Sequence, residues 1–378
     1  MSAPLLEARG YGIASTEKPT DFSVQSYKLK TPGPRDVTLS IEYCGVCGSD
    51  VHTVTGGWGP LAADWVVPGH EVVGFVSHVG EDAKDEFKLG QRVGVGAQVF
   101  SCLDCKRCKT DNEQYCPKMV DTYNASYSDG VLAQGGYSSA IRVDKQFVFA
   151  IPEALESEKV GPLFCAGATV YSPLVRNDVG PGKRVGIVGI GGLGHLAVQF
   201  AKALGAHVTV FSHSISKATD AIRLGADQFI STADKDFASK FQGDDELDFI
   251  LITADANALP MGDLMGTLKL HHKAVAVGIP DAHTPWEIPG TALLGNGSCL
   301  GGSHIASKKE IIAMLDLAAK KNVRPWVDQI LPMSEAGKAI QGVKDNKVNR
   351  SYLEHNFEPS LILYLQVRYR YVLKQDLV

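Results

Sequence analysis

The sequence lacks an excess of basic residues. Its 378 residues include 37 lysines and arginines against 42 aspartates and glutamates, for a formal net charge of −5, and the basic residues are scattered along the chain. Proteins that bind nucleic acid or anionic membranes usually concentrate positive charge in one patch or stripe. We therefore expect no nucleic-acid or membrane partner, which leaves a small molecule as the expected ligand.

The sequence also lacks the hydropathy pattern of a targeting or membrane-spanning segment. The stretch Met1–Glu7 has no charged region followed by an apolar run, which a secretory signal needs. The most apolar window, 185–201, is interrupted by glycines and a histidine and is short for a bilayer span. We expect a cytoplasmic protein.

Disulfides are a further feature that we do not expect. The chain has eight cysteines, and cysteines in a chain without a secretory signal indicate thiolate chemistry. Four of them lie close together, at Cys102, Cys105, Cys108 and Cys116. Four crowded thiolates are best explained by a cation that neutralises them, and a tetrahedron of four sulfurs is the usual structural zinc site. A redox-active Cys-x-x-Cys is the alternative, but it would leave the fourth cysteine unexplained.

A second set of candidate metal ligands lies in the stretch Tyr43–Glu71. It contains Cys47 and the adjacent pair His70 and Glu71. A lone cysteine or histidine is more often a core residue, but a thiolate, an imidazole and a carboxylate together are the ligands of a catalytic zinc. A further ligand must come from elsewhere in the chain, and Cys165 is the candidate.

The residue pattern changes character near Pro152. Before it, short alternating strands such as 36–43, 72–80 and 91–95 are separated by glycine and proline turns, which indicates a small β-barrel. After it, strands alternate with helical periods, which predicts a doubly wound parallel sheet. A length of 378 residues is too great for one ordinary core. We therefore predict an α/β protein of two domains.

The clearest unit of the second half is a glycine-rich turn between a strand and a helix. An apolar strand begins at Arg184, an amphipathic helix covers 196–204, and a second strand follows at 207–211. In that context a Gly-x-Gly-x-x-Gly pattern predicts dinucleotide binding, because glycines let the backbone approach a pyrophosphate and the helix N-terminus supplies free N–H groups. The predicted binding residues are Gly189, Gly191, Gly192, Leu193 and Gly194.

The second strand of this half ends without the acidic residue that would hold the ribose 2′-hydroxyl of NAD. Donors and positive charge stand there instead, and the first carboxylate is Asp220. A 2′-phosphate needs such groups, so we predict NADP(H), bound by Ser212, His213, Ser214 and Lys217. The alternative is an ordinary polar helix cap.

Taken together, these motifs resemble the zinc-dependent medium-chain alcohol dehydrogenases of the cinnamyl alcohol dehydrogenase class, and within it the fungal, yeast-type NADPH-dependent members. The resemblance runs from about residue 10 to 348 and resumes at Arg368. It rests on motifs that occur in the family's order: 47–52, 68–71, 92–102, the four-cysteine loop, 134–137, 165–174 and 189–194. Such an ordered set is highly specific.

The resemblance implies roles for the residues of the metal site. Cys47, His70 and Cys165 correspond to the ligands of the catalytic zinc. Glu71 corresponds to a carboxylate that can close the fourth position when substrate is absent. Asp50 stands where the family has an acidic residue that orients the zinc histidine.

The resemblance also implies roles in proton transfer and cofactor binding. Ser49 matches the hydroxyl that exchanges a proton with the substrate oxygen, and His52 matches the relay onward to solvent. Thr169 matches a cofactor contact near the nicotinamide. Trp58 either lines the substrate site or packs on the barrel as a lid.

The implied fold is a GroES-like β-barrel catalytic domain made of 1–154 and 298–378, with a Rossmann domain at 155–297. The helix 308–321 would return the chain to the barrel. The implied activity is the reversible, NADPH-linked reduction of aromatic, cinnamyl and medium-chain aliphatic aldehydes to primary alcohols. The implied assembly is a homodimer with two zinc ions per chain. The alternative activity is that of an NAD(P)-dependent polyol dehydrogenase of the sorbitol type.

Two features depart from the family. Residues 349–367 interrupt its closing strand, and our hypothesis is a gene-model error such as a retained intron, with a genuine surface loop as the alternative. If the insertion is real, we expect it to displace the last strand and with it Arg368, where a contact to the cofactor phosphate is expected. Cys44 and Cys299 match no ligand position and are interpreted as packing residues.

Overall fold

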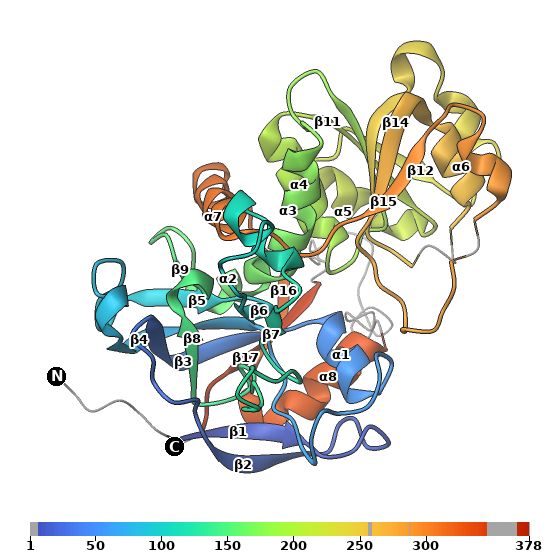
Figure 1. Ribbon diagram of the computed structural model, residues 1–378. Coiled ribbons are helices and arrows are strands. Elements are labelled where there is room, and N and C mark those ends of the chain that lie inside the picture. The colour runs from blue at the N-terminus through green and yellow to red at the C-terminus, as the bar shows by residue number, and fades with distance from the viewer. Residues whose placement is uncertain (1–6, 256–258, 287, 346–368, 378) are drawn as a thin grey trace, which may run out of the picture. The chain divides into compact units, whose positions relative to one another are not determined.

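The computed structural model describes residues 7–255, 259–286, 288–345 and 369–377. The chain divides into two compact units (Figure 1). The first consists of Met1–Cys105, Cys116–Cys165 and Pro325–Val378, and the second of Lys106–Tyr115 and Ala166–Arg324. Among the residues described, no helix is both long enough and apolar enough to cross a membrane.

The first unit is built on a seven-stranded sheet with the order β16-β17-β3-β4-β5-β9, and β8 pairs with β3 beside this path. Its strands are β3 (Asp36–Val46), β4 (Glu71–Val79), β5 (Arg92–Val95), β8 (Ala140–Asp144), β9 (Val148–Ala150), β16 (Val327–Pro332) and β17 (Arg370–Lys374). Two small sheets pair β1 (Glu7–Ile13) with β2 (Phe22–Lys28) and β6 (Gln98–Phe100) with β7 (Val120–Asp121). The helices are α1 (Gly48–Val54), α2 (Ser157–Val160) and α8 (Ala336–Lys344).

Strand β3 organises this unit, because it pairs with β4, β8 and β17. Its alternate residues Val37, Leu39 and Ile41 are buried in one hydrophobic core, as the period of a strand requires. The register of β3 and β4 places Gly45 opposite Glu71. A Cβ on Gly45 would overlap the Glu71 carboxylate, so this close approach needs glycine. The segments just after β3 and just before β4 therefore lie side by side.

The last strand, β17, is paired on both sides within the sheet of the first unit. β17 pairs in parallel with β16 and antiparallel with β3. The predicted insertion 349–367 and Arg368 lie outside the described residues. The expectation that the insertion would displace the strand is wrong for Arg370–Lys374, because the alternating apolar residues of this segment pack into the core in the usual way.

The second unit contains a six-stranded sheet in which every pair of neighbours is parallel, with the order β12-β11-β10-β13-β14-β15. This confirms the predicted doubly wound sheet. Its strands are β10 (Arg184–Val188), β11 (His207–Ser212), β12 (Gln228–Ser231), β13 (Leu247–Ile252), β14 (Leu268–Ala276) and β15 (Cys299–Gly302). The helices are α3 (Ala166–Arg176), α4 (Gly194–Leu204), α5 (Ala218–Arg223), α6 (Met261–Gly266) and α7 (Lys308–Lys321).

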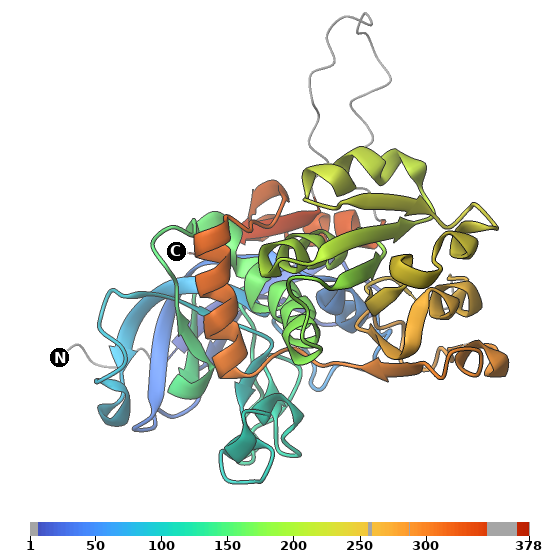
Figure 2. The same cartoon turned by 90° about the horizontal axis from the view of Figure 1, so that it is seen from above.

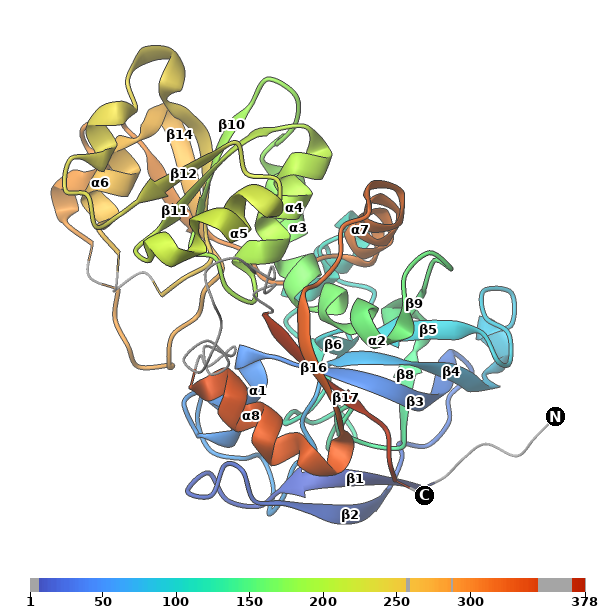
Figure 3. The same ribbon diagram turned by 180° about the vertical axis from the view of Figure 1, so that it is seen from behind.

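Helices cover both faces of this sheet (Figures 2 and 3). α4 packs on β10 and β11 and α3 on β13, whereas α6 packs on β14. One core joins Val188, Phe211 and Ile250 of the strands to Met261 and Leu264 of α6. The central strands β10, β11 and β13 are mostly apolar and buried, as in a parallel sheet with both faces covered.

The compact units differ in their bounds from the predicted domains. The predicted boundary at 297/298 precedes β15, yet β15 is the outer strand of the parallel sheet and α7 packs on α3. The segment 298–324 therefore belongs to the second unit, and α7 does not return the chain to the first. The boundary predicted at 154/155 lies before α2, which packs on β3 and β4 of the first unit. An amphipathic segment does not reveal from its sequence which sheet it will cover.

Candidate functional site

The three predicted ligands of the catalytic zinc converge inside the first unit. Cys47 precedes α1, His70 precedes β4, and Cys165 lies at the end of the unit's middle segment. The Sγ atoms of Cys47 and Cys165 are 3.9 Å apart, and Nε2 of His70 is 3.1 Å from Sγ of Cys165. One donor atom from each of Cys47, His70, Glu71 and Cys165 lies within 4.8 Å of the others, and all four residues are buried. Two sulfurs, a nitrogen and an oxygen at this spacing are a donor set that fits zinc.

The electrostatics of this cluster favour a thiolate. A hydrogen bond from Cys165 lowers the pKa of Cys47 well below its usual value, against the effect of burial and with help from the positive charge of Arg370. The same hydrogen bond to Cys47, together with burial, raises the pKa of Cys165. Burial opposes the charged form of His70, but Asp50 and Cys47 outweigh it and raise the pKa of the imidazole. The thiolate form that a metal ligand needs is thus favoured at Cys47.

Glu71 forms a buried ion pair with Arg370 of β17. Nη1 of Arg370 donates to Oε1 of Glu71 over 3.0 Å and to the carbonyl oxygen of Val46 over 3.3 Å. The exposed fractions of the two side chains are 4% for Arg370 and 0% for Glu71. Oε2 of Glu71 is buried without a hydrogen-bond partner. Burial raises the pKa of Glu71 to about 7, with Arg370 acting in the opposite direction. The ion pair thus holds one oxygen of this carboxylate, and the other oxygen has no hydrogen-bond partner among the described residues and can act as a metal ligand.

Asp50 contacts two of the candidate zinc ligands, Cys47 and His70. It is fully buried at the third position of α1. Its Oδ2 accepts a hydrogen bond from the backbone N–H of Cys47 over 2.8 Å, and its Oδ1 lies 3.2 Å from Nδ1 of His70. This contact turns Nε2 of His70 toward the sulfurs, which is the arrangement that a zinc-binding histidine needs.

Ser49 and His52 both lie on α1. Sγ of Cys47 is 3.7 Å from Oγ of Ser49, so the hydroxyl is next to the donor cluster. The ring of His52 stacks on Trp58 with the centroids 4.8 Å apart and the planes 9° apart. Trp58, which is 37% exposed, therefore packs against the predicted relay histidine.

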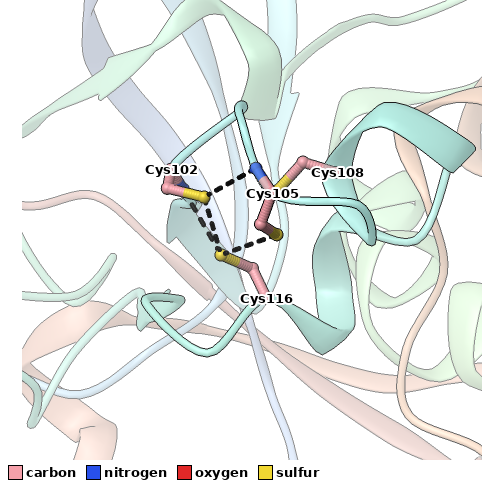
Figure 4. A group of neighbouring side chains, drawn as sticks. All are labelled: Cys102, Cys105, Cys108 and Cys116. Carbon is pink, nitrogen blue, oxygen red and sulfur yellow. Dashed lines mark hydrogen bonds between the residues drawn. The ribbon is translucent and has the colours of Figure 1, made fainter.

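The second predicted metal cluster is also assembled. The four Sγ atoms of Cys102, Cys105, Cys108 and Cys116 lie within 4.8 Å of one another (Figure 4). Backbone hydrogen bonds, including one from the N–H of Cys105 over 3.3 Å, lower the pKa of Cys102 to about 6. Four sulfurs with no carboxylate or imidazole among them fit a closed structural zinc site.

The other two cysteines differ from each other. Cys44 is completely buried, as expected for a packing residue. Cys299 is exposed, so its interpretation as a packing residue was wrong. β15 is the outer strand of its sheet, and most of its residues are exposed.

The predicted cofactor residues lie at the carboxyl end of β10, where the strand order of the parallel sheet reverses. Gly189 has a φ of +88°, and a Cβ on Gly194 would lie 2.1 Å from the carbonyl oxygen of Gly189, so both positions need glycine. A Cβ on Gly191 would meet nothing within 4 Å. The turn is therefore tight at its two ends and open in the middle, next to Gly192 and Leu193, where a pyrophosphate would fit.

One of the polar residues predicted to bind the 2′-phosphate contacts this turn. Nζ of Lys217 donates to the carbonyl oxygen of Ile190 over 2.9 Å, which brings the end of β11 and the glycine turn together. The N–H of Ser214 bonds to Oγ of Ser212, and Oγ of Ser214 lies 2.7 Å from that of Ser216. His213 is exposed between the two serines. Thr169 is half-buried on α3 of the same unit.

Comparison with known proteins identifies the family of the chain. Residues 33–153 match the alcohol dehydrogenase GroES-like domain, and residues 192–320 match the zinc-binding dehydrogenase domain. The chain is 42% identical to NADP-dependent alcohol dehydrogenase 6 of Saccharomyces cerevisiae over 335 residues, which cover 87% of this chain and 90% of that protein. The chain belongs to the zinc-dependent medium-chain alcohol dehydrogenases.

Solved structures of this family have the same fold. A cinnamyl alcohol dehydrogenase of Sorghum bicolor is 36% identical, with a TM-score of 0.84 and 97% of both chains covered. A Helicobacter pylori member solved in complex with NADP(H) is 32% identical, with a TM-score of 0.83 and 98% of both chains covered. The predicted fold, a GroES-like domain with a Rossmann domain, is thereby confirmed for this alcohol dehydrogenase.

Sequence analysis missed two residues of the site. Arg370 received no role from the sequence, and it is the arginine that pairs with Glu71. Tyr137 was part of a recognised motif and received no role, although its hydroxyl donates to Asp50 over 3.2 Å. Both residues lie in motifs that the resemblance covers, but the contacts of Arg370 with Glu71 and of Tyr137 with Asp50 join distant parts of the chain and leave no local signal.

The buried ion pair yields a test of the site's stability. Arg370→Met would leave the Glu71 carboxylate buried without its counter-charge, so we expect unfolding free energy to fall by about 3 kcal/mol. The measurement is urea-induced unfolding of the purified protein. Lys338→Met is the control, because Lys338 pairs with Glu335 at the surface, and we expect a change of about 0.5 kcal/mol or less. Equal losses in the two variants would contradict the assignment.

Proposed function

We propose that this alcohol dehydrogenase reduces aldehydes to primary alcohols with NADPH, reversibly. The observation that carries the proposal is the convergence of Cys47, His70 and Cys165 on one buried point. This donor set occurs in a chain whose relatives include an NADP-dependent alcohol dehydrogenase. A site of two sulfurs and one nitrogen keeps a coordination position for substrate, as a catalytic zinc requires.

In this proposal Cys47, His70 and Cys165 hold a catalytic zinc, and Glu71 stands beside it. When bound, zinc supplies a Lewis acid that polarises the substrate oxygen, and NADPH supplies the hydride. Asp50 keeps the proton of His70 on Nδ1, so that Nε2 is free to bind metal. The hydrogen bond from Cys165, with help from the positive charge of Arg370, lowers the pKa of Cys47 and favours its thiolate. The four cysteines from Cys102 to Cys116 hold a second, structural zinc.

Ser49 and His52 move the proton. The hydroxyl of Ser49 lies next to Cys47 and gives its proton to the substrate oxygen during reduction. His52 on the same helix is half-buried and returns a proton from solvent to Ser49. Stacking on Trp58 restricts the orientation of the His52 ring.

NADPH binds to the second unit. The open backbone around Gly191 and the N-terminus of α4 accept the pyrophosphate. Ser212, His213, Ser214 and Lys217 surround the 2′-phosphate, and Thr169 contacts the cofactor near its nicotinamide.

The substrate class follows from the relatives and from the charges of the chain. A cinnamyl alcohol dehydrogenase is among the solved structures that share the fold, which supports aromatic and medium-chain aldehydes. The polyol dehydrogenase alternative has less support from these relatives. A cytoplasmic location, based on cysteine usage, and a homodimer, based on family resemblance, complete the proposal.

Removing the hydroxyl of Ser49 tests the proton path. We expect Ser49→Ala to lower kcat for cinnamaldehyde reduction with NADPH by about a hundredfold, the lower range for a lost proton donor, and to leave zinc content unchanged. Thr55→Val is the matched control, because the Thr55 hydroxyl lies at the far end of α1 and bonds to the carbonyl oxygen of Val51. Wild-type turnover in Ser49→Ala would refute the role of Ser49. Faster sorbitol oxidation than cinnamaldehyde reduction by the wild-type enzyme would favour the polyol alternative.

A zinc count tests the two metal sites separately. We expect two zinc ions per wild-type chain and one in either Cys165→Ser or Cys108→Ser. Only Cys108→Ser should lower the temperature of unfolding strongly, because structural zinc contributes its binding energy to folding. Cys299→Ser is the control, since Cys299 is exposed and outside both clusters, and should retain two zinc ions. A Cys165→Ser protein with two zinc ions would rule out the catalytic site.

The choice of cofactor depends on the end of β11. A carboxylate there repels a 2′-phosphate and can bind a ribose 2′-hydroxyl, so Ser212→Asp should shift the ratio of kcat/KM for NADPH and NADH at least about tenfold toward NADH. Ser239→Asp adds the same charge elsewhere in the unit and should leave the ratio unchanged. An unchanged ratio in Ser212→Asp would count against NADP(H).

A further inference from the structure

The Asp50 carboxylate accepts four hydrogen bonds in a fully buried position. The donors to Oδ2 are the N–H of Cys47 over 2.8 Å and the hydroxyl of Tyr137 over 3.2 Å. The donors to Oδ1 are the N–H of Gly69 and Nδ1 of His70, both over 3.2 Å. A buried carboxylate is stable only when such donors compensate its charge. Three of the four donors belong to the segments that carry Cys47 and His70, and the fourth is Tyr137.

Tyr137 reaches this carboxylate from a separate part of the chain. The turn before β8 runs beside the segment that ends at His70. The backbone N–H groups of Gly135, Gly136 and Tyr137 donate to the carbonyl oxygens of Val67, Gly69 and Pro68 over 2.7 to 2.9 Å. The phenol is therefore attached to the same segment that it helps to orient.

The ring of Tyr137 is tightly confined. It is completely buried, and the Phe22 ring lies against it with the centroids 6.2 Å apart. Gly69 has a φ of +101°, and a Cβ there would lie 2.5 Å from Cδ1 of Tyr137. Because the ring has no room to move, the position of its hydroxyl is fixed, and so is the direction of its bond to Asp50.

A phenylalanine would fill the same space, so packing alone does not explain the hydroxyl. Without it, Oδ2 of Asp50 loses one of its donors, and the carboxylate can rotate about its Cβ–Cγ bond. Its negative charge is then less compensated on the Oδ2 side, and its hold on the Nδ1 proton of His70 changes in direction and strength. Hydrogen bonds to the carboxylate that holds a metal-binding histidine affect both the orientation and the basicity of that histidine.

We propose that Tyr137 is a positioning residue of the catalytic zinc site, which acts through Asp50 on His70 and Cys47. The inference rests on the proposed function, because it requires zinc at those residues. Tyr137 contacts neither metal nor substrate in this scheme. It holds one oxygen of Asp50 so that the other oxygen stays aligned with Nδ1 of His70.

Tyr137→Phe tests this proposal with the full-length protein. The first measurement is zinc retention at the catalytic site, by competition with a chelator. The second is the visible absorption of the Co²⁺-substituted protein, which reports the ligand field. We expect zinc affinity to fall about tenfold, the lower end for a lost outer-shell partner, and the cobalt absorption to shift. Tyr27→Phe is the control, since Tyr27 is a tyrosine of the same unit that packs on Trp65 and belongs to neither metal cluster, and should match the wild type.

A double variant tests the route through Asp50. In an Asp50→Asn background, Tyr137→Phe should change zinc affinity less than twofold, because the acceptor that Tyr137 acts on is altered. An undiminished tenfold effect there would overturn the proposal, as would wild-type zinc affinity and cobalt absorption in Tyr137→Phe. A wild-type protein that retains no zinc at Cys47, His70 and Cys165 would refute the proposed function itself, and the inference with it.

Discussion

The constraint on which this structure depends is the burial of two sulfurs and an imidazole around one point. Sγ of Cys165 lies 3.9 Å from Sγ of Cys47 and 3.1 Å from Nε2 of His70, in a region from which water is excluded. Charged thiolates in such a place are costly unless a cation compensates them. The surrounding charges fit that requirement. A hydrogen bond from Cys165 and the positive charge of Arg370 favour the thiolate of Cys47, and Asp50 lies against Nδ1 of His70, on the side away from the sulfurs.

The sheet of the first unit makes this burial possible. The pairing of β3 with β4 brings the segments of Cys47 and His70 together, and the glycine at 45 lets them approach closely. β17 joins the opposite edge of β3 and contributes Arg370 to the same site. Residues 47, 70, 165 and 370 are widely separated in the chain, so gathering them costs loop-closure entropy. Strand pairing offsets part of that cost, and metal binding would offset more.

The glycine turn of the second unit, in contrast, is formed by residues that are close in the chain. The order of its parallel strands reverses between β10 and β13, and the glycine turn lies at the carboxyl end of β10. Thr253 after β13 bonds to the carbonyl oxygens of Val188 and Gly189, which fastens the turn across the reversal point. The part of this site that would receive the pyrophosphate is built from one strand, one turn and one helix that are consecutive in the chain.

The sequence by itself therefore determined what consecutive residues can specify. The four-cysteine loop, the glycine turn, the strands on either side of it and the donor residues after β11 could be predicted, because spacing and backbone freedom decide them locally. The tertiary structure alone decided the rest. It showed that Arg370 is paired with Glu71, that Tyr137 bonds to Asp50, that Cys299 is exposed and that the segment 298–324 belongs with the parallel sheet. These contacts join residues far apart in the chain, and the pairing of strands, which no single segment encodes, is what brings them together.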